Sequence, residues 1–366
     1  MYQPKFQGKI CFMNRHGDSY ACNPKYITEE IISQKLSLEL IWFVHDLSTP
    51  MPNNVRKVLL NSSEMYKELA TSDIFIFNLT DYYYPKKLGQ FWIMTWHGGQ
   101  GFKLVQRLAE NRLYKSYVEN SKKIAANIDL ILAGSEYQYQ EIKYEWYYKG
   151  LILKSGLPRN DIFFKDNSKL IDKTRISLNI PDDYSLIIYA PTFRTGIKYN
   201  FEVYQFDVDK LLSSLYKRFN KKFKLLTRIH PLYSWRHITS SSIFKEHPDV
   251  IDVTHYSDVQ PLLLASDILI SDYSSIINEF LVMNKPVFIY AKDLYSYLQE
   301  RGVNWTYWNI PYKINITENE LFKSIEEYSE EETFIKRQQF IDSVKLYDNG
   351  EASKKVVEII KSVLNI

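Results

Sequence analysis

Residues 268–280 read Ile-Leu-Ile-Ser-Asp-Tyr-Ser-Ser-Ile-Ile-Asn-Glu-Phe, and residues 284–290 read Asn-Lys-Pro-Val-Phe-Ile-Tyr. The apolar run that begins at Ile268 is short and β-branched, as in an interior strand of a parallel sheet. A polar turn follows it, then a helix-like stretch, and then a second apolar run. This order predicts a strand, a turn, a helix and another strand, which is the repeating unit of an α/β fold.

The predicted turn carries two adjacent serines, Ser274 and Ser275. Either hydroxyl is a natural N-cap for the helix that follows, because it can accept a free backbone N–H. The other N–H groups and the helix dipole would then form an anion site at the carboxyl end of the strand. Glu279 lies one helical turn later, where its carboxylate is expected to reach ribose hydroxyls. A capped helix needs no ligand, so this stretch alone is also consistent with a purely structural turn.

Size and composition narrow the class of protein. At 366 residues the chain exceeds what one hydrophobic core usually serves, which predicts two domains. The net charge of +3 and the lack of a basic, aromatic-rich pattern argue against a nucleic-acid partner. Cys11 and Cys22 lack metal-ligand spacing and suit a reducing cytosol. No signal-peptide pattern and no run of about 18 apolar residues occurs, so we expect a cytoplasmic protein that does not span the membrane.

Strand-like segments alternate with amphipathic stretches along the chain, which predicts parallel sheets. The predicted strands are 9–14, 39–45, 74–78, 91–96, 130–134, 152–155, 186–190, 224–229, 250–253, 268–271 and 286–290. The polar stretch 165–181 separates the two series. We therefore predict two Rossmann-like, doubly wound domains that face a cleft, the GT-B arrangement, over 1–165 and 166–345. A helical segment over 346–366 is expected to pack back on the first domain.

Three of the twelve glycines, Gly98, Gly99 and Gly101, closely follow Trp96-His97. A glycine-rich turn at the carboxyl end of a strand lets the backbone approach a ligand closely. His97 is thus predicted to face the cleft, where an imidazole can take a proton from an attacking hydroxyl. The alternative is a structural histidine that caps a turn.

The segment Arg228-Ile-His230-Pro231 ends a predicted strand of the second domain. Alternation puts Arg228 and His230 on one side of that strand, where they would bind a diphosphate and offset charge on a leaving phosphate. The alternative is an arginine in a surface ion pair and a histidine oriented by the proline. Arg194, which follows another strand, is also expected to face the cleft, and Thr192 is expected to bond a phosphate oxygen. The remaining histidines show no metal-ligand spacing, so no metal site is predicted.

These segments, with others in the same order, resemble the CDP-glycerol glycerophosphotransferase family of bacterial teichoic-acid primases and polymerases. The resemblance spans roughly residues 9–300. Its motifs are Gly17-Asp-Ser-Tyr-Ala-Cys-Asn23-Pro24-Lys25-Tyr26, Thr95-Trp-His97-Gly98, Gly156-Leu-Pro158-Arg159-Asn160-Asp161, Tyr189-Ala-Pro191-Thr192-Phe-Arg194, Arg228-Ile-His230-Pro231 and the stretch 258–290. The family commonly has Thr-Pro-Leu-Lys after the histidine motif, whereas this chain has Gly99-Gln-Gly-Phe-Lys103, which leaves acceptor specificity open.

The resemblance implies the GT-B fold, a CDP-activated donor and a role for each candidate residue. It implies His97 and His230 as catalytic residues, with His230 at the donor diphosphate. The expected donor-binding residues are Arg228, Ser274, Ser275, Glu279, Thr192 and Arg194. The expected acceptor-side residues are Gly98, Gly99, Asn23 and Lys25. No cofactor is firmly implied, and a requirement for a divalent metal stays open.

The stretch 102–123 is basic and amphipathic, which usually indicates a solvated helix face. Its basic residues are Lys103, Arg107, Arg112, Lys115, Lys122 and Lys123. An enzyme that extends a lipid-linked acceptor works at an anionic bilayer, and basic helices with apolar flanks can attach a protein there. We therefore expect peripheral association with the inner face of the bacterial membrane.

The predicted function is transfer of glycerol phosphate, or a related polyol phosphate, from a CDP-activated donor to a hydroxyl. The acceptor would be a lipid-linked (polyprenyl diphosphate) molecule or a polymer, in teichoic-acid or capsule synthesis, and CMP would be released. A CDP-ribitol-dependent transferase is nearly as consistent with the sequence. The rival hypotheses are a GT-B glycosyltransferase that uses a nucleotide sugar and a non-catalytic assembly protein at the membrane surface.

Overall fold

The computed structural model describes residues 8–80, 83–99, 101–194, 201–229, 243–244 and 246–366. The chain forms two compact units. The first comprises residues 1–99, 105–165 and 345–366, and the second comprises residues 100–104 and 166–344. The short segment 100–104 thus belongs to the second unit, whereas the sequence-based division kept it in the first domain.

The first unit contains a seven-stranded sheet in the order β3-β2-β1-β4-β5-β6-β7, in which every pair of neighbours is parallel. Its strands are β1 (Lys9–Met13), β2 (Glu39–Val44), β3 (Val55–Leu59), β4 (Ile74–Phe77), β5 (Phe91–Met94), β6 (Leu130–Ala133) and β7 (Leu151–Lys154). The central strands are buried on both faces, as their continuous apolar runs predicted.

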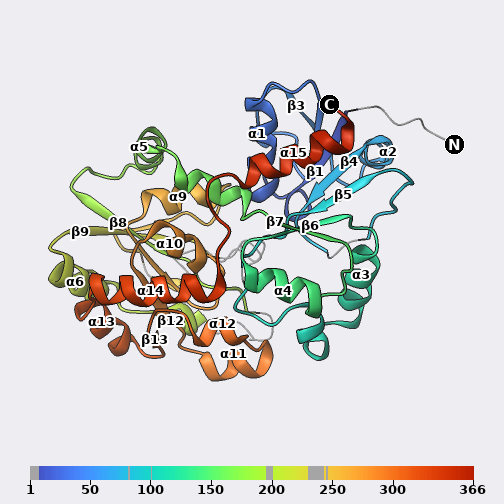
Figure 1. The fold of residues 1–366 in the computed structure, drawn as a ribbon. Helices are drawn as coiled ribbons and strands as arrows, with labels where there is room; N and C mark the ends of the chain where they lie inside the picture. The colour runs from blue at the N-terminus through green and yellow to red at the C-terminus, as the bar shows by residue number, and fades with distance from the viewer. Residues whose placement is uncertain (1–7, 81–82, 100, 195–200, 230–242, 245) are drawn as a thin grey trace. The chain divides into compact units, whose positions relative to one another are not determined.

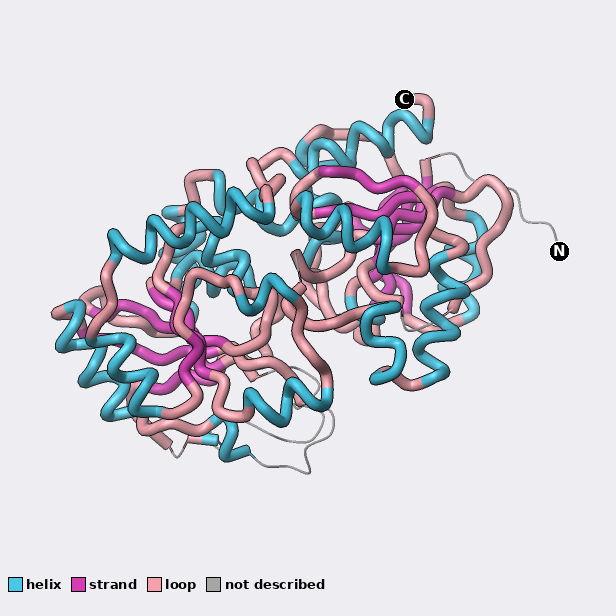
Figure 2. Tube along the Cα trace, turned by 60° about the horizontal axis from the view of Figure 1, so that its bottom comes forward, coloured by secondary structure: helices cyan, strands magenta, loops and turns pink. Residues whose placement is uncertain are grey.

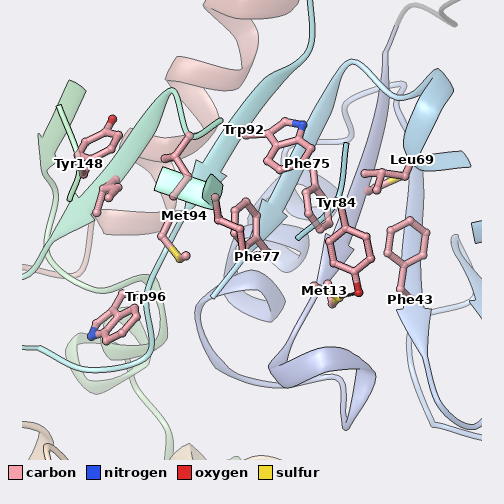
Figure 3. Close-up of a cluster of buried hydrophobic side chains, with 14 of the residues drawn as sticks. Met13, Phe43, Leu69, Phe75, Phe77, Tyr84, Trp92, Met94, Trp96 and Tyr148 are labelled. Atoms are coloured by element: carbon pink, nitrogen blue, oxygen red, sulfur yellow. Dashed lines mark hydrogen bonds between the residues drawn. The ribbon is translucent and has the colours of Figure 1, made fainter. Parts of the chain in front are cut away.

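Helices cover both faces of this sheet. On one face lie α1 (Cys22–Ser33) and α15 (Ala352–Leu364), which contact each other (Figure 1). On the other face lie α2 (Ser63–Thr71), α3 (Lys115–Ala125) and α4 (Glu136–Glu145). The core beneath these three helices is rich in aromatic rings, including Phe75, Phe77, Trp92 and Trp96 (Figure 3). Short 3₁₀ helices span Arg15–Gly17 (η1), Gln106–Arg112 (η2) and Pro158–Phe164 (η3).

The second unit contains a six-stranded parallel sheet in the order β10-β9-β8-β11-β12-β13. Its strands are β8 (Tyr184–Tyr189), β9 (Lys222–Thr227), β10 (Val250–Asp252), β11 (Ile268–Ser271), β12 (Val287–Tyr290) and β13 (Ile314–Asn315). Its helices are η4 (Phe201–Tyr204), α5 (Ser168–Ser177), α6 (Val208–Phe219), α9 (Val259–Ala265), α10 (Ile277–Met283), α11 (Leu294–Glu300), α12 (Trp305–Trp308), α13 (Glu318–Glu326) and α14 (Glu330–Val344). Figure 2 shows strands flanked by helices in each unit.

Both sheets follow the same winding, in which the chain starts at a central strand and later reverses direction across the sheet. The reversal falls between β1 and β4 in the first unit and between β8 and β11 in the second. In open α/β sheets, ligands bind beyond the carboxyl ends of the strands at such a point. A ligand site is therefore expected at the loops after β1, β4 and β5 in the first unit. In the second unit it is expected at the loops after β8 and β11.

Candidate active site

His97 lies two residues beyond Thr95, at the carboxyl end of β5, and its ring is partly exposed. The ring nitrogen Nδ1 is 3.1 Å from the backbone oxygen of Asn78, which follows β4. A carbonyl oxygen only accepts hydrogen bonds, so Nδ1 must carry the proton of this bond. The neutral ring then has its lone pair on Nε2, which is the arrangement that a proton acceptor needs.

Asn78 also holds the loop after β1, which brings two strand ends together. Its Nδ2 donates to Oδ1 of Asn14 at 2.7 Å, and its Oδ1 accepts from the backbone N–H of Arg15 at 2.9 Å. Asn14 in turn donates to the backbone oxygen of Ser19 at 3.1 Å. Asn14 and Asn78 are buried, so the loops at the switch point are fixed by a neutral hydrogen-bond network.

The turn that carries His97 is strained and braced. Trp96 has a left-handed backbone (φ 55°), while its ring lies in the core against Trp146. Asn23 Nδ2 donates to the backbone oxygen of Trp96 at 2.9 Å, and Arg159 Nη1 donates to that of His97 at 2.5 Å. A non-glycine residue in this conformation costs about 1–3 kcal/mol, and such strain concentrates at functional sites.

The four residues expected on the acceptor side take different places in the first unit. Asn23 is completely buried, and its Oδ1 accepts from the backbone N–H of Arg159 at 3.1 Å. Its amide thus supports the His97 turn. Lys25 Nζ lies 3.8 Å from Glu29 and 5.0 Å from the ring centre of Tyr26 on α1. Gly98 and Gly99 are buried in the turn, and the oxygen of Gly98 accepts from Gln138.

In the second unit, Arg194 occupies a buried cage and is only 4% exposed. Its Nε and Nη2 donate to Asp293 at 2.6 and 2.9 Å, and Nη2 also donates to Asp272 at 2.8 Å. The rings of Tyr273 and Tyr297 both lie 4.9 Å from the guanidinium carbon. Arg194, which was predicted to bind the donor, thus lies among two carboxylates and two aromatic rings next to the turn.

Asp272, the residue after β11, links the two loops at the switch point. Its Oδ1 accepts from the backbone N–H groups of Thr192 at 2.8 Å and Tyr273 at 2.6 Å. The hydroxyl of Thr192 is buried and has no hydrogen-bond partner within the described part of the chain. An unsatisfied buried hydroxyl is costly, so Thr192 is suited to bond an oxygen of a ligand.

The serine turn differs from the predicted N-cap. Helix α10 starts at Ile277, and its N-cap position, Ile276, makes no side-chain cap. Ser274 Oγ accepts a long bond, 3.4 Å, from the N–H of Ile276. Ser274 and Ser275 are both partly exposed, which leaves their hydroxyls accessible to a ligand. Glu279 is buried in the first turn of α10.

The remaining donor candidates lie after β9. Arg228 Nη1 donates to the backbone oxygens of Val253 at 2.9 Å and Tyr256 at 2.7 Å, so it fastens the loop between β10 and α9. The second candidate catalytic residue, His230, lies outside the described residues, and so does the proline behind it.

The predicted basic helix over 102–123 is divided in the structure. Residues 101–104 belong to the second unit, where Lys103 is partly buried, and only α3 is α-helical. Arg107, Arg112, Lys115 and Lys123 are exposed on η2 and α3, and Lys122 is paired with Glu110 at 2.7 Å. Next to Lys103, Phe102 is buried against Tyr307.

No group of three or more His, Cys, Asp or Glu side chains within the described residues could hold a metal ion. No helix in the same ranges is both long and apolar enough to cross a membrane.

A family model described as CDP-Glycerol:Poly(glycerophosphate) glycerophosphotransferase matches residues 1–362. The chain belongs to this family. The predicted family is thereby confirmed, and its description agrees with the predicted class of enzyme.

Curated members of the glycerophosphotransferase family resemble the chain over nearly all its length. It is 29% identical to the teichoic acid poly(glycerol phosphate) polymerase of Staphylococcus epidermidis, over 96% of this chain and 50% of that protein. It is 28% identical to the polymerase of the same name from Bacillus spizizenii, over 97% of this chain and 92% of that protein. The chain thus spans about half of the first relative and almost all of the second.

Solved structures of the wall teichoic acid polymerase TagF share the fold. One matches 99% of this chain and 90% of its own with a TM-score of 0.84 and 28% identity. A variant of TagF soaked with CDPG matches with a TM-score of 0.83 and 26% identity. The predicted fold class, GT-B with two doubly wound parallel sheets, is confirmed.

Sequence reasoning missed several residues that organise the site of this family member. Asn78 and Asp293 belong to no motif, and their partners are distant in sequence. Each directly follows or lies close after a strand, which is the signal that would have marked them as candidates. Arg159, which belongs to the motif over 156–161, holds the carbonyl of His97 within the first unit.

Proposed function

We propose that the protein transfers glycerol phosphate from CDP-glycerol to a hydroxyl of a lipid-linked or polymer acceptor, in teichoic-acid or capsule-type polymer synthesis. The acceptor oxygen forms a bond to the phosphorus that bears glycerol, and the bond from that phosphorus to the oxygen of CMP breaks. The family description and the CDPG-soaked relative support the choice of donor. The single observation that carries the proposal is the match over residues 1–362, which includes every candidate residue.

In this proposal His97 is the general base. The carbonyl of Asn78 holds Nδ1, so Nε2 receives the proton of the attacking hydroxyl. The strained turn at Trp96 and the bond from Arg159 fix the position of the ring. Alignment and electrostatic stabilisation would supply the rest of the rate enhancement, as in other phosphoryl transfers.

The second unit is proposed to bind the donor at the loops after β8 and β11. The accessible hydroxyls of Ser274 and Ser275 and the unsatisfied hydroxyl of Thr192 would bond diphosphate oxygens. Arg228 and His230 are proposed to lie at the same diphosphate, and Glu279 at the ribose. Arg194 would act indirectly, by fixing Asp272 and hence the turn.

Donor binding tests this assignment. The variant with Ser274→Ala and Ser275→Ala is expected to bind CDP-glycerol about tenfold or more weakly in calorimetry, since each lost hydrogen bond costs about 0.5–1.5 kcal/mol. Ser213→Ala, at an exposed serine of α6, is the control and should bind like the parent. Equal affinity of all three proteins would assign the serine turn a structural role only.

The second candidate donor is CDP-ribitol, because the chain is also 26% identical, over 98% of its length, to a teichoic acid poly(ribitol-phosphate) polymerase of Bacillus spizizenii. The purified protein should be offered CDP-glycerol, CDP-ribitol and UDP-sugars with lipid-linked acceptors. Release of CMP from CDP-glycerol alone supports the first donor. Release of UDP from a sugar donor would overturn phosphotransfer in favour of glycosyl transfer.

We also propose peripheral association with the inner face of the membrane through η2 and α3. Their exposed basic residues lie among apolar side chains, including Tyr114, which is 82% exposed. Each basic residue near an anionic surface contributes about 1 kcal/mol at most, so several must act together and salt should weaken the attachment.

Vesicle sedimentation tests this attachment. Changing Arg107, Arg112, Lys115, Lys122 and Lys123 to glutamine should release the protein from vesicles rich in anionic lipid. The matched control changes five exposed lysines of the second unit to glutamine: Lys169, Lys173, Lys210, Lys217 and Lys221. If both variants sediment like the parent, η2 and α3 are only solvated surface.

A further inference from the structure

The segment 101–104 is fastened within the second unit by backbone pairing. Lys103 forms an antiparallel bridge with Val303, and the N–H of Leu104 donates to the oxygen of Gly302 at 3.3 Å. The N–H of Asn304 donates to the oxygen of Phe102 at 2.8 Å. The side chains of Asn304 and Thr306 both donate to the oxygen of Gly101. These contacts hold a short strand against the end of α11 and the start of α12.

Aromatic rings join this strand to the serine turn. Phe102 is fully buried, with its ring centre 5.9 Å from that of Tyr307. The ring of Tyr307 lies 5.4 Å from that of Tyr273, which directly precedes Ser274. Successive side chains of a strand point to opposite sides, so Lys103 leaves the strand on the face opposite Phe102.

Charged groups of the second unit, one of them next to the serine turn, act on the ammonium of Lys103. Its electrostatic neighbours are Arg301, Asp272 and Arg194. Burial lowers the pKa of Lys103 to about 8, the Arg301 guanidinium lowers it as well, and Asp272 partly opposes both. Asp272 already accepts bonds from Arg194 and from two backbone N–H groups. The backbone pairing of Lys103 and Leu104 with Val303 and Gly302 brings Lys103 close to Arg301 in the chain, and an arriving anion would relieve the repulsion between the two cations.

We propose that Lys103 is a direct ligand of the donor diphosphate, on the side of the serine turn supplied by residues 101–104. This inference rests on the proposed function, because a nucleoside diphosphate is the anion that the turn would receive. A lysine ammonium is a common phosphate ligand, and here the backbone pairing to Gly302–Asn304 holds it in place before the donor arrives.

The proposal predicts a characteristic dependence of donor affinity on pH. A diphosphate binds the protonated amine, so affinity should be highest below pH 8 and fall as Lys103 loses its proton above it. Burial lowers the pKa of Arg194, but Asp272 and Asp293 outweigh that effect and raise it, so Arg194 stays protonated in this range. The rings of Tyr273, Tyr297 and Tyr307 stay neutral, because burial raises the pKa of each. Lys103 is therefore expected to set the pH dependence of donor binding between pH 7 and pH 9.

Calorimetry with CDP-glycerol, and separately with inorganic pyrophosphate, at several pH values from 6.5 to 9.5 tests the proposal. Lys103→Met should weaken binding of both ligands at pH 7 by roughly tenfold or more, as expected for a lost bond to a charged group. Lys103→Arg should keep the affinity and abolish its fall above pH 8. Lys313→Met, at an exposed lysine of the second unit, is the control and should match the parent.

The outcomes separate this inference from the proposed function. Parent-like affinity and pH profile in Lys103→Met overturn the inference. A parent that binds pyrophosphate but not CDP-glycerol, with pyrophosphate binding lost in Lys103→Met, supports the lysine contact and contradicts the choice of donor. If Lys103→Met fails to fold in a melting experiment, Lys103→Arg decides alone: a pH profile like that of the parent overturns the contact.

Discussion

The two units share one strand winding, yet their candidate sites are held together by different chemistry. In the first unit, buried neutral amides join the loops: Asn14, Asn23 and Asn78 bond backbone groups around His97. In the second unit, a buried charged cluster does so: Arg194 lies between Asp272 and Asp293. Similar topology therefore does not prescribe how the loops at a switch point are fixed.

The difference fits what each loop must do in the proposed reaction. In the first unit a neutral partner, the carbonyl of Asn78, fixes the tautomer of His97. The turn of the second unit uses a carboxylate to order two backbone N–H groups, and a bare carboxylate would repel a diphosphate. Arg194 compensates that charge, so Asp272 can order the turn without excluding the anion.

The largest effect should come from removing the base of the first unit. His97→Ala is expected to lower kcat by ~10²–10⁴-fold with little change in affinity for CDP-glycerol, because the second unit is proposed to bind the donor. Steady-state kinetics and calorimetry measure the two quantities. His45→Ala, at an exposed histidine of the same unit, is the control. Turnover near that of the parent would exclude His97 from proton transfer.

The charged cluster should be the more fragile of the two networks. Arg194→Met leaves two buried carboxylates without their partner, which is expected to cost about 3–5 kcal/mol of unfolding free energy. Urea unfolding measures the total loss of unfolding free energy. Hydrogen exchange at β8 and β11 shows whether the loss arises around the charged cluster. Arg218→Met, at a partly exposed arginine of α6, should cost about 1 kcal/mol or less. A loss as small as that of the control would mean that the cluster adds little stability.

The neutral network should tolerate loss of one member better. Asn78→Ala removes the amide that bonds Asn14 and Arg15, and about 1–3 kcal/mol of unfolding free energy is expected to be lost. The backbone oxygen that holds His97 remains, so kcat should change far less than in His97→Ala. Asn54→Ala, at an exposed site, is the control for the same unfolding measurement. If Asn78→Ala lost as much unfolding free energy as Arg194→Met, the two networks would not differ in their tolerance of substitution.

The smallest effect is expected at a surface charge of the first unit. Hydrogen bonds from Lys154, Tyr347 and Gln140 lower the pKa of Glu136 to about 2. The stabilisation is therefore complete above its ordinary pKa of 4.5 and is lost as the pH falls toward 2. Water screens this site, so Glu136→Gln should cost about 1 kcal/mol or less at pH 7. The unfolding free energies of parent and variant, measured from pH 7 to pH 2, should converge at the acid end. A difference that grew toward pH 2 would show that the Glu136 carboxylate is not the stabilising group.

The sequence predicted the strands that bear continuous apolar runs, because burial on both faces leaves a clear pattern. It missed β3 (Val55–Leu59), an edge strand in which Arg56 and Lys57 interrupt the apolar residues. It also missed β13, which has only two residues. Such short or edge strands form through pairing with a neighbour, and that contact leaves little trace in local sequence.

Candidate residues could be predicted from the sequence where they lie in a recognisable motif. They could not be predicted where they depend on contacts between residues that are distant in the chain. His97, Thr192 and the two serines follow strands in recognisable segments. The charge pattern put Lys103 on a basic helix, but burial of Phe102 on Tyr307 assigns that segment to the second unit. The roles of Asn78 and Asp293 follow from loops that converge only in the folded units.

The position of α15 in the chain has a consequence for biosynthesis. The first sheet is complete at Lys154, yet four apolar residues of α15 that cover one of its faces, including Val356 and Ile360, are translated only after residues 166–344. Until then that face has α1 but lacks α15, and exposed apolar surface of this kind attracts chaperones and promotes aggregation. Asp161, which accepts hydrogen bonds from the first N–H groups of α15, likewise lacks these partners until α15 has been translated. Residues 166–344 are thus synthesised before the first unit can finish folding. If the second unit folds slowly or misfolds, both units would be exposed to proteolysis.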